Sequence, residues 1–418
     1  MKQNKFIMLF LFISVAIFIL TKYNSIDNSS IAVYLDNIES ASIPDRNSNY
    51  IIDKIVCDNG AIGTWDSIKW GISLENLNKK TNCKLYFKKQ DTIIIADTTI
   101  KIDEYSKCTK INDDGTVSIT APESNNSYLC KAPDDYGVSY YFRGNVINNY
   151  VYFAGFYWRI LRVNGDGSLR IIYDGTSSHD NDDINDDRVI GSSRYNSSED
   201  DNAYVGYMYG TPGSSTYEET HTNINNSTIK EAVDKWYENN LKDTIYEKYI
   251  IDNEFCNDRT INKSEYIKAL YPNYSNNGFN NEGTIYRWDK GPWNDSNSGN
   301  TDFLLYCKQQ NDKLSVINNN LKYSIALITA DELILSGIYR TSTSNNNFLC
   351  SSSNFWTMSA SDYNSSGWAG VQAIEDCVFH SSGAFNVRAI GSIKPVINID
   401  KGAIASGDGT KNNPFKLS

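Results

Sequence analysis

The chain has 418 residues, of which 40% are hydrophobic and 13% aromatic, so the composition predicts a globular protein with a sizeable core and room for two domains. Its formal net charge at pH 7 is −11, and no stretch concentrates lysine and arginine. We therefore expect no nucleic-acid partner, because such a partner requires basic patches that replace counterions.

An apolar run extends from Phe6 to Leu20, after Lys2 and Lys5 and before Lys22. It suits the core of a signal peptide or a short membrane-spanning helix. No Ala-x-Ala cleavage signal lies nearby, so we expect residues 1–24 to be an uncleaved anchor, with a cleaved signal peptide as the alternative. The lysines before the run orient the rest of the chain outward. The expected location is the extracellular face of the plasma membrane, with membrane contact through this helix only.

Eight cysteines support an oxidising compartment, and no two are closer in sequence than 22 residues. That spacing excludes zinc sites built from Cys-x-x-Cys pairs and favours disulfides. The simplest pairing joins sequence neighbours: Cys57 with Cys83, Cys108 with Cys130, Cys256 with Cys307, and Cys350 with Cys377.

Residues 25–48 are polar and predict a tether. A small β-rich, sandwich-like domain is expected over 49–105, because Trp70, Ile72 and Leu74 alternate with polar residues, as half-buried strands do. Trp65 and Trp70 are expected in its core; the alternative is that they stack on a sugar. Residues 106–138 are interpreted as a connector, and a second domain is expected over 139–405, with a tail over 406–418.

Within the second domain, the segments Tyr157–Val163 and Ser168–Tyr173 flank the glycine-containing sequence Asn164-Gly-Asp-Gly167. This pattern predicts a β-hairpin with a tight turn. Further on, Thr228-Ile-Lys-Glu231 has the sequence of a capping box and opens an amphipathic helix expected to end near Leu241.

Between these elements lies a loop rich in aspartate, and a calcium site is one interpretation of it. The EF-hand pattern needs a glycine at its sixth position and a carboxylate at its twelfth, but here those positions hold Asn185 and Gly191. A solvated acidic loop is therefore favoured. Calcium remains the alternative, with ligands at Asp180, Asp182, Asp183 and Asp186; no other cofactor is expected.

The stretch from Tyr323 to Asp400 is the most informative. The apolar run Tyr323–Ile328 predicts a buried strand, and the capping box Thr329–Glu332 opens a short helix that ends before Gly337. Two further core strands are predicted at Phe355–Ser359 and Ile393–Ile399.

That order of elements resembles the C-type-lectin-like fold of formylglycine-generating enzymes, Fibrobacter-type paralogous surface domains and related uncharacterised bacterial modules. Upstream, Phe142–Asn145 and Phe153–Ile160 fit the same pattern, so the resemblance covers about residues 140–405. The chain departs from it at Lys394, where the pattern usually has arginine, and at Ala360, where proline often follows the serine. The fold class implied is α+β: a C-type-lectin-like domain after the small β-domain and the membrane helix.

The sequence offers no enzyme motif: His-Glu-x-x-His, the Gly-x-Ser-x-Gly elbow and phosphate-binding glycine loops are absent, and no catalytic residue is assigned. The related oxidases use two cysteines a few residues apart, whereas Cys350 and Cys377 are 27 residues apart. His380 follows Cys377 by three positions, and on a strand the two side chains would point to opposite faces.

We therefore expect a non-catalytic surface module that binds a glycan or a protein outside the cell; an oxidase or hydrolase on the same scaffold, or a structural envelope protein, is the alternative. The resemblance implies that the region before the closing strand carries the ligand. The candidate ligand-binding residues are Trp356, Trp368, Gln372, His380, Asn386 and Arg388. Trp356 lies in an apolar strand, so a core position is favoured for it, whereas for Trp368, next to Gly367 in a loop, a core position and a ligand-binding position are equally open.

Overall fold

The computed structural model describes residues 29–77, 80–119, 126–214, 216–260, 303–318, 320–338, 346–350, 354–363, 367–375, 377–379 and 385–417. The expected N-terminal anchor lies outside these residues. Within the part of the chain that the structure describes, no helix is long and apolar enough to span a membrane. The protein is mostly β-sheet, with 42% strand and 13% helix, so the expected α+β class is wrong.

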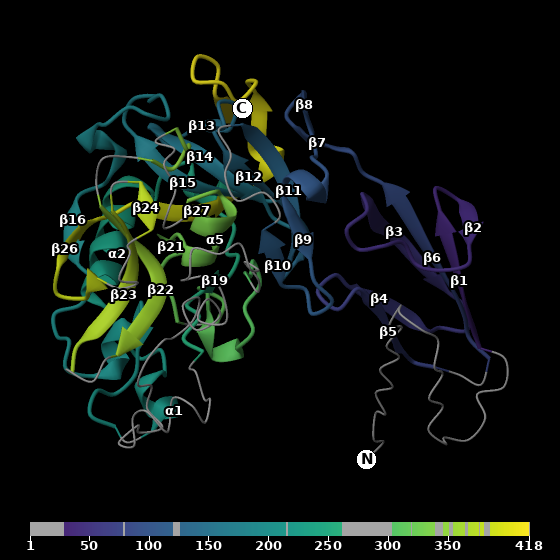
Figure 1. Cartoon of the computed structure of the whole chain (residues 1–418), viewed down its shortest axis with the longest axis horizontal. Helices are drawn as coiled ribbons and strands as arrows, with labels where there is room; N and C mark the ends of the chain where they lie inside the picture. Colours follow the sequence, from purple (N-terminus) through teal and green to yellow (C-terminus); the bar gives the residue numbers. More distant parts are fainter. Residues whose placement is uncertain are drawn as a thin grey trace.

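The N-terminal part forms a separate small unit, drawn in purple and blue at the right of Figure 1. Its four-stranded sheet has the order β2-β1-β6-β3, and β1 runs parallel to β6. Leu85, Phe87 and Trp70 lie in its core, and Trp65 packs edge-on against Trp70. The two tryptophans are therefore core residues, as expected. The strands are β1 (Ser30–Leu35), β2 (Ile38–Ser40), β3 (Tyr50–Cys57), β6 (Asn82–Lys89) and the hairpin β4 (Ile62–Asp66) with β5 (Gly71–Glu75).

The largest described sheet belongs to the second unit and has nine strands, with the path β21-β27-β15-β14-β13-β29-β28 and with β12 and β11 branching from β14. The hairpin predicted around Asn164–Gly167 is confirmed, with β14 and β15 antiparallel. The bounds are β11 (Ser127–Asp134), β12 (Gly137–Gly144), β13 (Tyr150–Phe153), β14 (Phe156–Val163), β15 (Leu169–Gly175), β21 (Ala326–Leu327), β27 (Pro395–Ile399), β28 (Ile404–Ser406) and β29 (Phe415–Leu417).

A second sheet of six described strands follows the order β16-β26-β22-β23-β24, and β25 pairs with β23. Its long hairpin, β22 with β23, crosses the lower left of Figure 1. The bounds are β16 (Ser192–Arg194), β22 (Phe355–Tyr363), β23 (Ala369–Glu375), β24 (Val378–Phe379), β25 (Phe385–Asn386) and β26 (Ile390–Ser392).

Short pairs and helices complete the described fold. The pairs are β7 (Thr92–Ile95) with β8 (Thr98–Lys101), β9 (Thr109–Ile111) with β10 (Val117–Ile119), β17 (Met208–Tyr209) with β18 (Asn225–Asn226), and β19 (Phe255–Cys256) with β20 (Lys313–Leu314). The α-helices are α1 (Tyr217–Thr220), α2 (Thr228–Asn240) and α5 (Ala330–Leu335).

The two predicted helix starts have different outcomes. The capping box at α5 is confirmed: the Thr329 side chain accepts from the Glu332 amide, and Glu332 accepts from the Thr329 amide. At α2, however, the N-cap is Ser227, one residue before the predicted Thr228. Gly337 has a φ of 103°, which fits the expected left-handed end of α5.

Three segments differ from their expected roles as linkers. Part of the tether becomes strand, because β1 pairs with the distant β6 and with β2. The connector contains β11, which pairs with β12 along its whole length. The tail contains β29, which pairs with β13 and β28 and buries Phe415 completely. The pairings of β1 and β29 join distant residues, which local composition does not reveal, whereas β11 and β12 form a local hairpin.

Three of the expected disulfides are present: Cys57–Cys83, Cys108–Cys130 and Cys256–Cys307. The first joins β3 to β6 at directly opposed positions. Three disulfides fit an oxidising environment outside the cytosol. No disulfide joins Cys350 to Cys377 in this structure.

Candidate functional site

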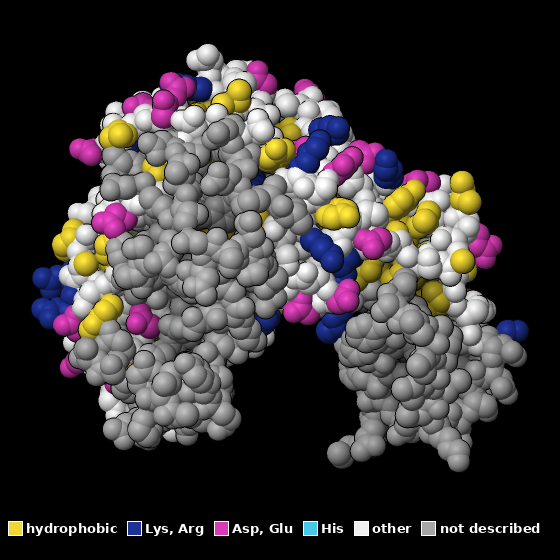
Figure 2. Space-filling view, in the orientation of Figure 1, with side chains coloured by type: hydrophobic (Ala, Val, Ile, Leu, Met, Phe, Trp, Pro, Cys, Tyr) yellow, Lys and Arg dark blue, Asp and Glu magenta, His cyan; other side chains and the backbone are white. Residues whose placement is uncertain are grey.

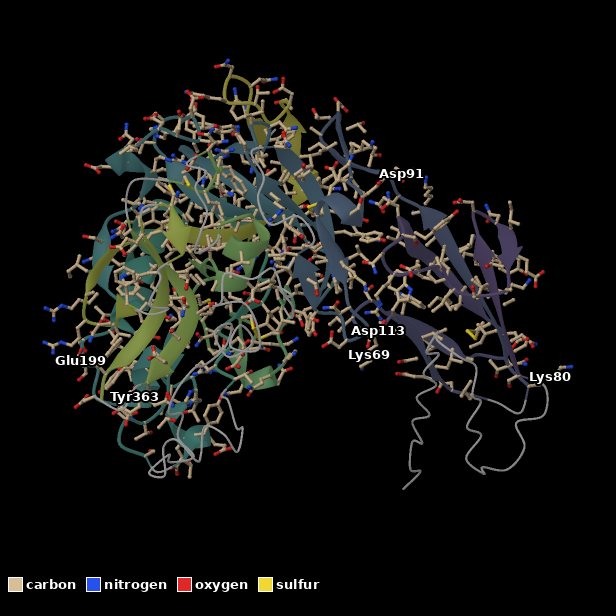
Figure 3. The ribbon with its side chains drawn as sticks, viewed as in Figure 1. Lys69, Lys80, Asp91, Asp113, Glu199 and Tyr363 are labelled. Atoms are coloured by element: carbon tan, nitrogen blue, oxygen red, sulfur yellow. A yellow bond between two sulfur atoms is a disulfide. The ribbon has the colours of Figure 1, made fainter. Side chains whose placement is uncertain are left out.

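Polar and aromatic side chains gather where β22 ends and β23 begins. Tyr363 ends β22 and pairs with Ala369, the first residue of β23. A loop packs against this end, because the Ala369 amide donates to the Glu199 carbonyl at 2.8 Å and the Tyr363 hydroxyl donates to the Asp200 carbonyl at 2.9 Å. Figure 3 labels Glu199 and Tyr363 at this end of the molecule. We call this cluster the rim; it consists of Glu199, Asp200, Tyr363, Trp368, Asn386 and Arg388.

The Glu199 carboxylate organises the rim. One oxygen accepts a hydrogen bond from the Asn386 side-chain amide, and the other lies 3.2 Å from Nη1 of Arg388. The Arg388 backbone amide donates to the Asn386 side chain at 2.8 Å. The Arg388 side chain remains 51% exposed, so its charge is oriented by Glu199 but still faces solvent.

The rim combines groups that suit a polar ligand. Tyr363 and Trp368 are half-buried, which leaves part of each ring accessible. Asn386 lies on the other side of β23 from Tyr363, because β25 pairs with β23 with Asn386 opposite Gly370. Ring faces pack on the apolar face of a sugar, and oriented amide and guanidinium groups bond its hydroxyls.

The sequence-predicted ligand residues divide into two groups. Trp368, Asn386 and Arg388 lie in the rim. Trp356 is 1% exposed, and its indole N–H donates to the Ser193 carbonyl at 3.0 Å. Gln372 is fully buried and donates to the Ser361 hydroxyl at 2.6 Å. These two side chains therefore pack in the core and cannot contact a ligand, and His380 lies outside the described residues.

Sequence reasoning missed Glu199, Asp200 and Tyr363. Glu199 is 189 positions before Arg388 in the chain and lies in an ordinary polar loop, Ser197-Ser-Glu-Asp-Asp201. No local motif marks it, because its role comes from the way the loop crosses the end of the second sheet.

The aspartate-rich loop places its side chains differently from a calcium site. His179 is nearly buried between two carboxylates: Nδ1 is 2.9 Å from Asp183 and Nε2 is 2.6 Å from Asp187. Asp180 pairs with Lys411 at 2.6 Å, and the other two candidate ligands, Asp182 and Asp186, are exposed. In the described residues, no group of three or more His, Cys, Asp or Glu side chains is arranged to hold a metal ion.

The same loop has the connectivity of a Ser-His-Asp triad, with the Ser177 hydroxyl 3.2 Å from Nε2 of His179 and Asp183 on the opposite ring nitrogen. Asp187 distinguishes this cluster from a Ser-His-Asp triad, because its carboxylate lies at the same ring nitrogen of His179 as the Ser177 hydroxyl. Burial raises the pKa of Asp187, but hydrogen bonds from Thr176 and the charge of His179 outweigh burial and hold that pKa below its ordinary value. Asp183 and Asp187 therefore hold the two ring nitrogens of His179, and the Ser177 hydroxyl also donates to Asp187, so the cluster links the two ends of the loop.

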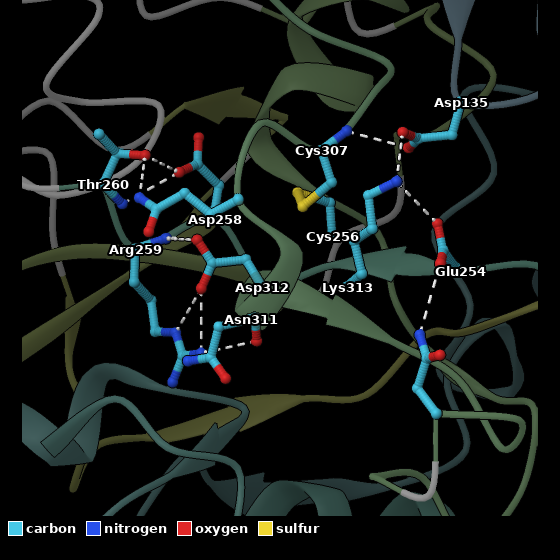
Figure 4. Close-up of a disulfide and its surroundings, with 12 residues drawn as sticks. Asp135, Glu254, Cys256, Asp258, Arg259, Thr260, Cys307, Asn311, Asp312 and Lys313 are labelled. Carbon is cyan, nitrogen blue, oxygen red and sulfur yellow. Dashed lines mark hydrogen bonds and ion pairs between the residues drawn. A yellow bond between two sulfur atoms is a disulfide. The ribbon is translucent and has the colours of Figure 1, made fainter. Parts of the chain in front are cut away.

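A small, partly open cavity lies at the start of α5. Glu332 bridges Arg162 at 2.6 Å and Arg170 at 2.5 Å. Figure 4 shows the neighbouring wall, where Lys313 lies between Asp135 and Glu254 beside the Cys256–Cys307 disulfide. The cavity measures about 30 Å³, which accommodates one or two water molecules and excludes a sugar ring.

Comparisons with protein-family models, with curated proteins and with solved structures found no match to this chain. The rim is therefore assigned from its own chemistry. On the face in Figure 2, acidic and basic side chains are interspersed among the described residues without a basic patch, which agrees with the acidic balance of the sequence.

Proposed function

We propose that this protein is a non-catalytic recognition module that acts outside the cell and binds a glycan through the rim. The observation that carries the proposal is the Glu199 carboxylate, which holds Asn386 and Arg388 in fixed positions within the rim that also contains Tyr363 and Trp368. A surface that already orders its hydrogen-bonding groups loses less conformational entropy when a ligand binds.

The chemistry of the rim favours a glycan over a protein partner. Protein recognition sites are typically centred on a large apolar anchor set in a pocket. The rim instead offers two half-buried rings and an oriented ionic network. The carboxylate, amide and guanidinium groups form hydrogen bonds in defined directions, which hydroxyl-rich ligands satisfy well.

The disulfides support the proposed location. Cys57–Cys83, Cys108–Cys130 and Cys256–Cys307 form readily in exported proteins, whereas the cytosol keeps most thiols reduced. We accordingly place the recognition function on the outer side of the cell envelope.

The test is a glycan array probed with the folded, disulfide-intact chain, followed by calorimetry on any sugar that binds. We expect saturable binding to one glycan class, and Trp368→Ala and Arg388→Ala should each weaken it at least about tenfold, because each removes about 1.4 kcal/mol or more of contact energy. Repeating the assay with EDTA tests a contribution from calcium at Asp180, Asp182, Asp183 and Asp186.

Arg194→Ala is the matched control, because Arg194 is an exposed arginine at the edge of the same sheet and pairs there with Ile390. It should leave the affinity unchanged. Absence of binding to any glycan by correctly folded protein would refute the proposal. Binding of a protein ligand that requires Arg388 would reassign the rim to protein recognition, and turnover of a bound sugar would reassign the protein as an enzyme.

A further inference from the structure

The four-stranded sheet of the N-terminal unit has two different faces. On one face, Val33, Leu85 and Phe87 are buried in the core of the unit, and Val138 of β12 packs against this core. Side chains alternate between the two faces of a strand, so the neighbouring residues of β1, β6 and β3 line the opposite face. They are half-buried or exposed, and Val56 among them is 50% exposed. This second face therefore meets solvent and is available to a partner.

Two tyrosines form the centre of this second face. Tyr34 of β1 stands directly opposite Tyr86 of β6, and their rings stack with centroids 4.9 Å apart and an angle of 15° between their planes. Lys54 of β3 stands opposite Tyr86 on its other side, and its ammonium lies 4.9 Å from the centroid of that ring. The Lys84 ammonium lies 5.9 Å from the centroid of the Tyr34 ring. We call these four side chains the tyrosine–lysine face.

The two lysines carry charge that no described carboxylate neutralises. Within the part of the chain that the structure describes, neither Lys54 nor Lys84 forms a salt bridge. By contrast, Lys88, on the same strand as Lys84, is paired with Asp53 at 2.8 Å. Glu39 lies on the edge strand β2, at the other end of the row from Lys54. Contacts with aromatic rings thus position two ammonium groups without a described carboxylate partner on a protein whose net charge is −11.

We propose that the tyrosine–lysine face binds an acidic polysaccharide. Carboxylates of the polymer accept hydrogen bonds from Lys54 and Lys84, and these bonds are strong because both partners are charged. The phenol hydroxyls of Tyr34 and Tyr86 make no hydrogen bond to any described residue, so they bond the hydroxyls of the sugar. At physiological ionic strength, charges are screened beyond about 8 Å, so the two nearby lysines outweigh the distant acidic residues.

The shape and charge of this face favour a polysaccharide over a protein partner. The centre of a protein–protein interface is depleted of lysine and is built around a large apolar anchor in a pocket. Here the central rings are flanked by lysines on an open sheet. A polymer that repeats its carboxylate along the chain can engage both ammonium groups at once, which raises its affinity above that of a single acidic sugar. The face belongs to a different unit from the rim, so the two sites are separate.

The test is retention of the folded, disulfide-intact chain on a column of immobilised polygalacturonate, with immobilised dextran as the neutral control polymer. We expect retention on polygalacturonate alone, and it should decrease as the salt concentration is raised. The double variant Lys54→Gln/Lys84→Gln should bind at least about tenfold more weakly. Lys89→Gln/Lys101→Gln is the matched control, because it removes the same charge outside the face, where Lys89 is already paired with Asp91 at 2.9 Å. It should bind like the parent.

Four outcomes would overturn the proposal, each with folding checked by circular dichroism. They are no retention of the parent, equal retention on dextran, equal weakening in the two double variants, which would indicate a response to net charge alone, and loss of retention in Arg388→Ala, which would assign the binding to the rim.

The tyrosine hydroxyls are tested separately. Tyr34→Phe/Tyr86→Phe keeps the ring stack but removes both hydroxyls, and we expect it to bind polygalacturonate about threefold more weakly. Unchanged binding would overturn the role of the hydroxyls. Failure of glycan binding at Trp368 would leave retention on polygalacturonate unaffected, so the proposals for the rim and for this face fail independently.

Discussion

At the scale of single residues, the most unusual feature of this protein is how many ionisable groups it buries. Burial raises the pKa of Asp134, Asp312 and Asp362 to about 6, because a charged carboxylate loses its hydration inside the protein. Asp362 is the least compensated of the three: a hydrogen bond from Ser361 opposes the shift, but one carboxyl oxygen has no partner.

Asp362 makes a prediction about stability and pH. The folded pKa of about 6 exceeds the ordinary 3.8, so the folded protein binds more protons than the unfolded chain between these values. The contribution of Asp362 to stability is therefore complete below about pH 4 and is lost as pH rises through 6. Asp362→Asn cannot ionise, and we expect it to raise the free energy of unfolding at pH 7 by about 1–2 kcal/mol.

The measurement is urea unfolding of both proteins at pH 4 and pH 7. The difference between variant and parent should be larger at pH 7. Asp182→Asn is the control, because Asp182 is exposed, and it should behave like the parent. A variant less stable than the parent at pH 7 would show that the Asp362 carboxylate is favourably bound.

At the scale of elements, local signals located most helices and strands but not always their first residue. The sequence Ser227-Thr-Ile-Lys-Glu231 offers two adjacent hydroxyl residues that could cap α2. Ser227 takes the position because its hydroxyl also donates to the Tyr207 carbonyl at 2.7 Å, a bond that only the folded protein provides. A tertiary contact therefore selects between two locally equivalent caps.

The cap can be tested by a pair of substitutions. Ser227→Ala removes the acceptor for the Lys230 amide and one of the two hydrogen bonds that the buried Tyr207 carbonyl accepts from Ser227, so it should destabilise the protein by about 1–2 kcal/mol. Thr228→Ala should cost less than about 0.5 kcal/mol, because Thr228 is not the cap. Chemical unfolding measures the loss of stability in both variants. Equal losses would indicate that Thr228 also caps α2.

At the scale of the whole molecule, the N-terminal unit docks onto the second unit through backbone-like hydrogen bonds. The Asn47 side chain donates to the Ile111 carbonyl at 3.1 Å and accepts from the Ile111 amide at 2.7 Å, as a neighbouring strand would. Lys131 donates to the carbonyls of Arg46 and Ser48. Figure 1 shows the two units meeting on this side, with β9 and β10 next to the N-terminal sheet.

Because the docking includes hydrogen bonds from Asn47 and Lys131, and the two cores are separate apart from Val138, which packs against both, weakening the docking should uncouple the unfolding of the two units. We expect Asn47→Ala to lower the unfolding temperature of the N-terminal unit by a few degrees while that of the second unit stays unchanged, as measured by calorimetry. Asn49→Ala is the control, because Asn49 bonds Asp91 at 2.8 Å on the surface. A single transition that shifts as a whole would show one cooperative unit.

Much of the local structure was predictable because short-range chemistry determines it. The glycine-containing turn between two strand-like segments identified the hairpin around Asn164–Gly167, and Thr329 with Glu332 identified the start of α5. The candidate site was predictable in part: Trp368, Asn386 and Arg388 lie in the rim, whereas Trp356 and Gln372 turned inward. Strand alternation alone does not show which face is covered, because both faces of β22 are buried along most of its length.

The sequence by itself determined the acidic surface, the export-compatible cysteines and the hairpins and caps, since each depends on residues close together in the chain or on composition. The tertiary structure alone decided that β1 joins β6, that β29 joins the large sheet, and that Glu199 meets Arg388 across 189 positions. Such contacts form because distant segments bury apolar surface together, and the polar groups brought beside them must then find partners. The local sequence does not show which distant segments will pair.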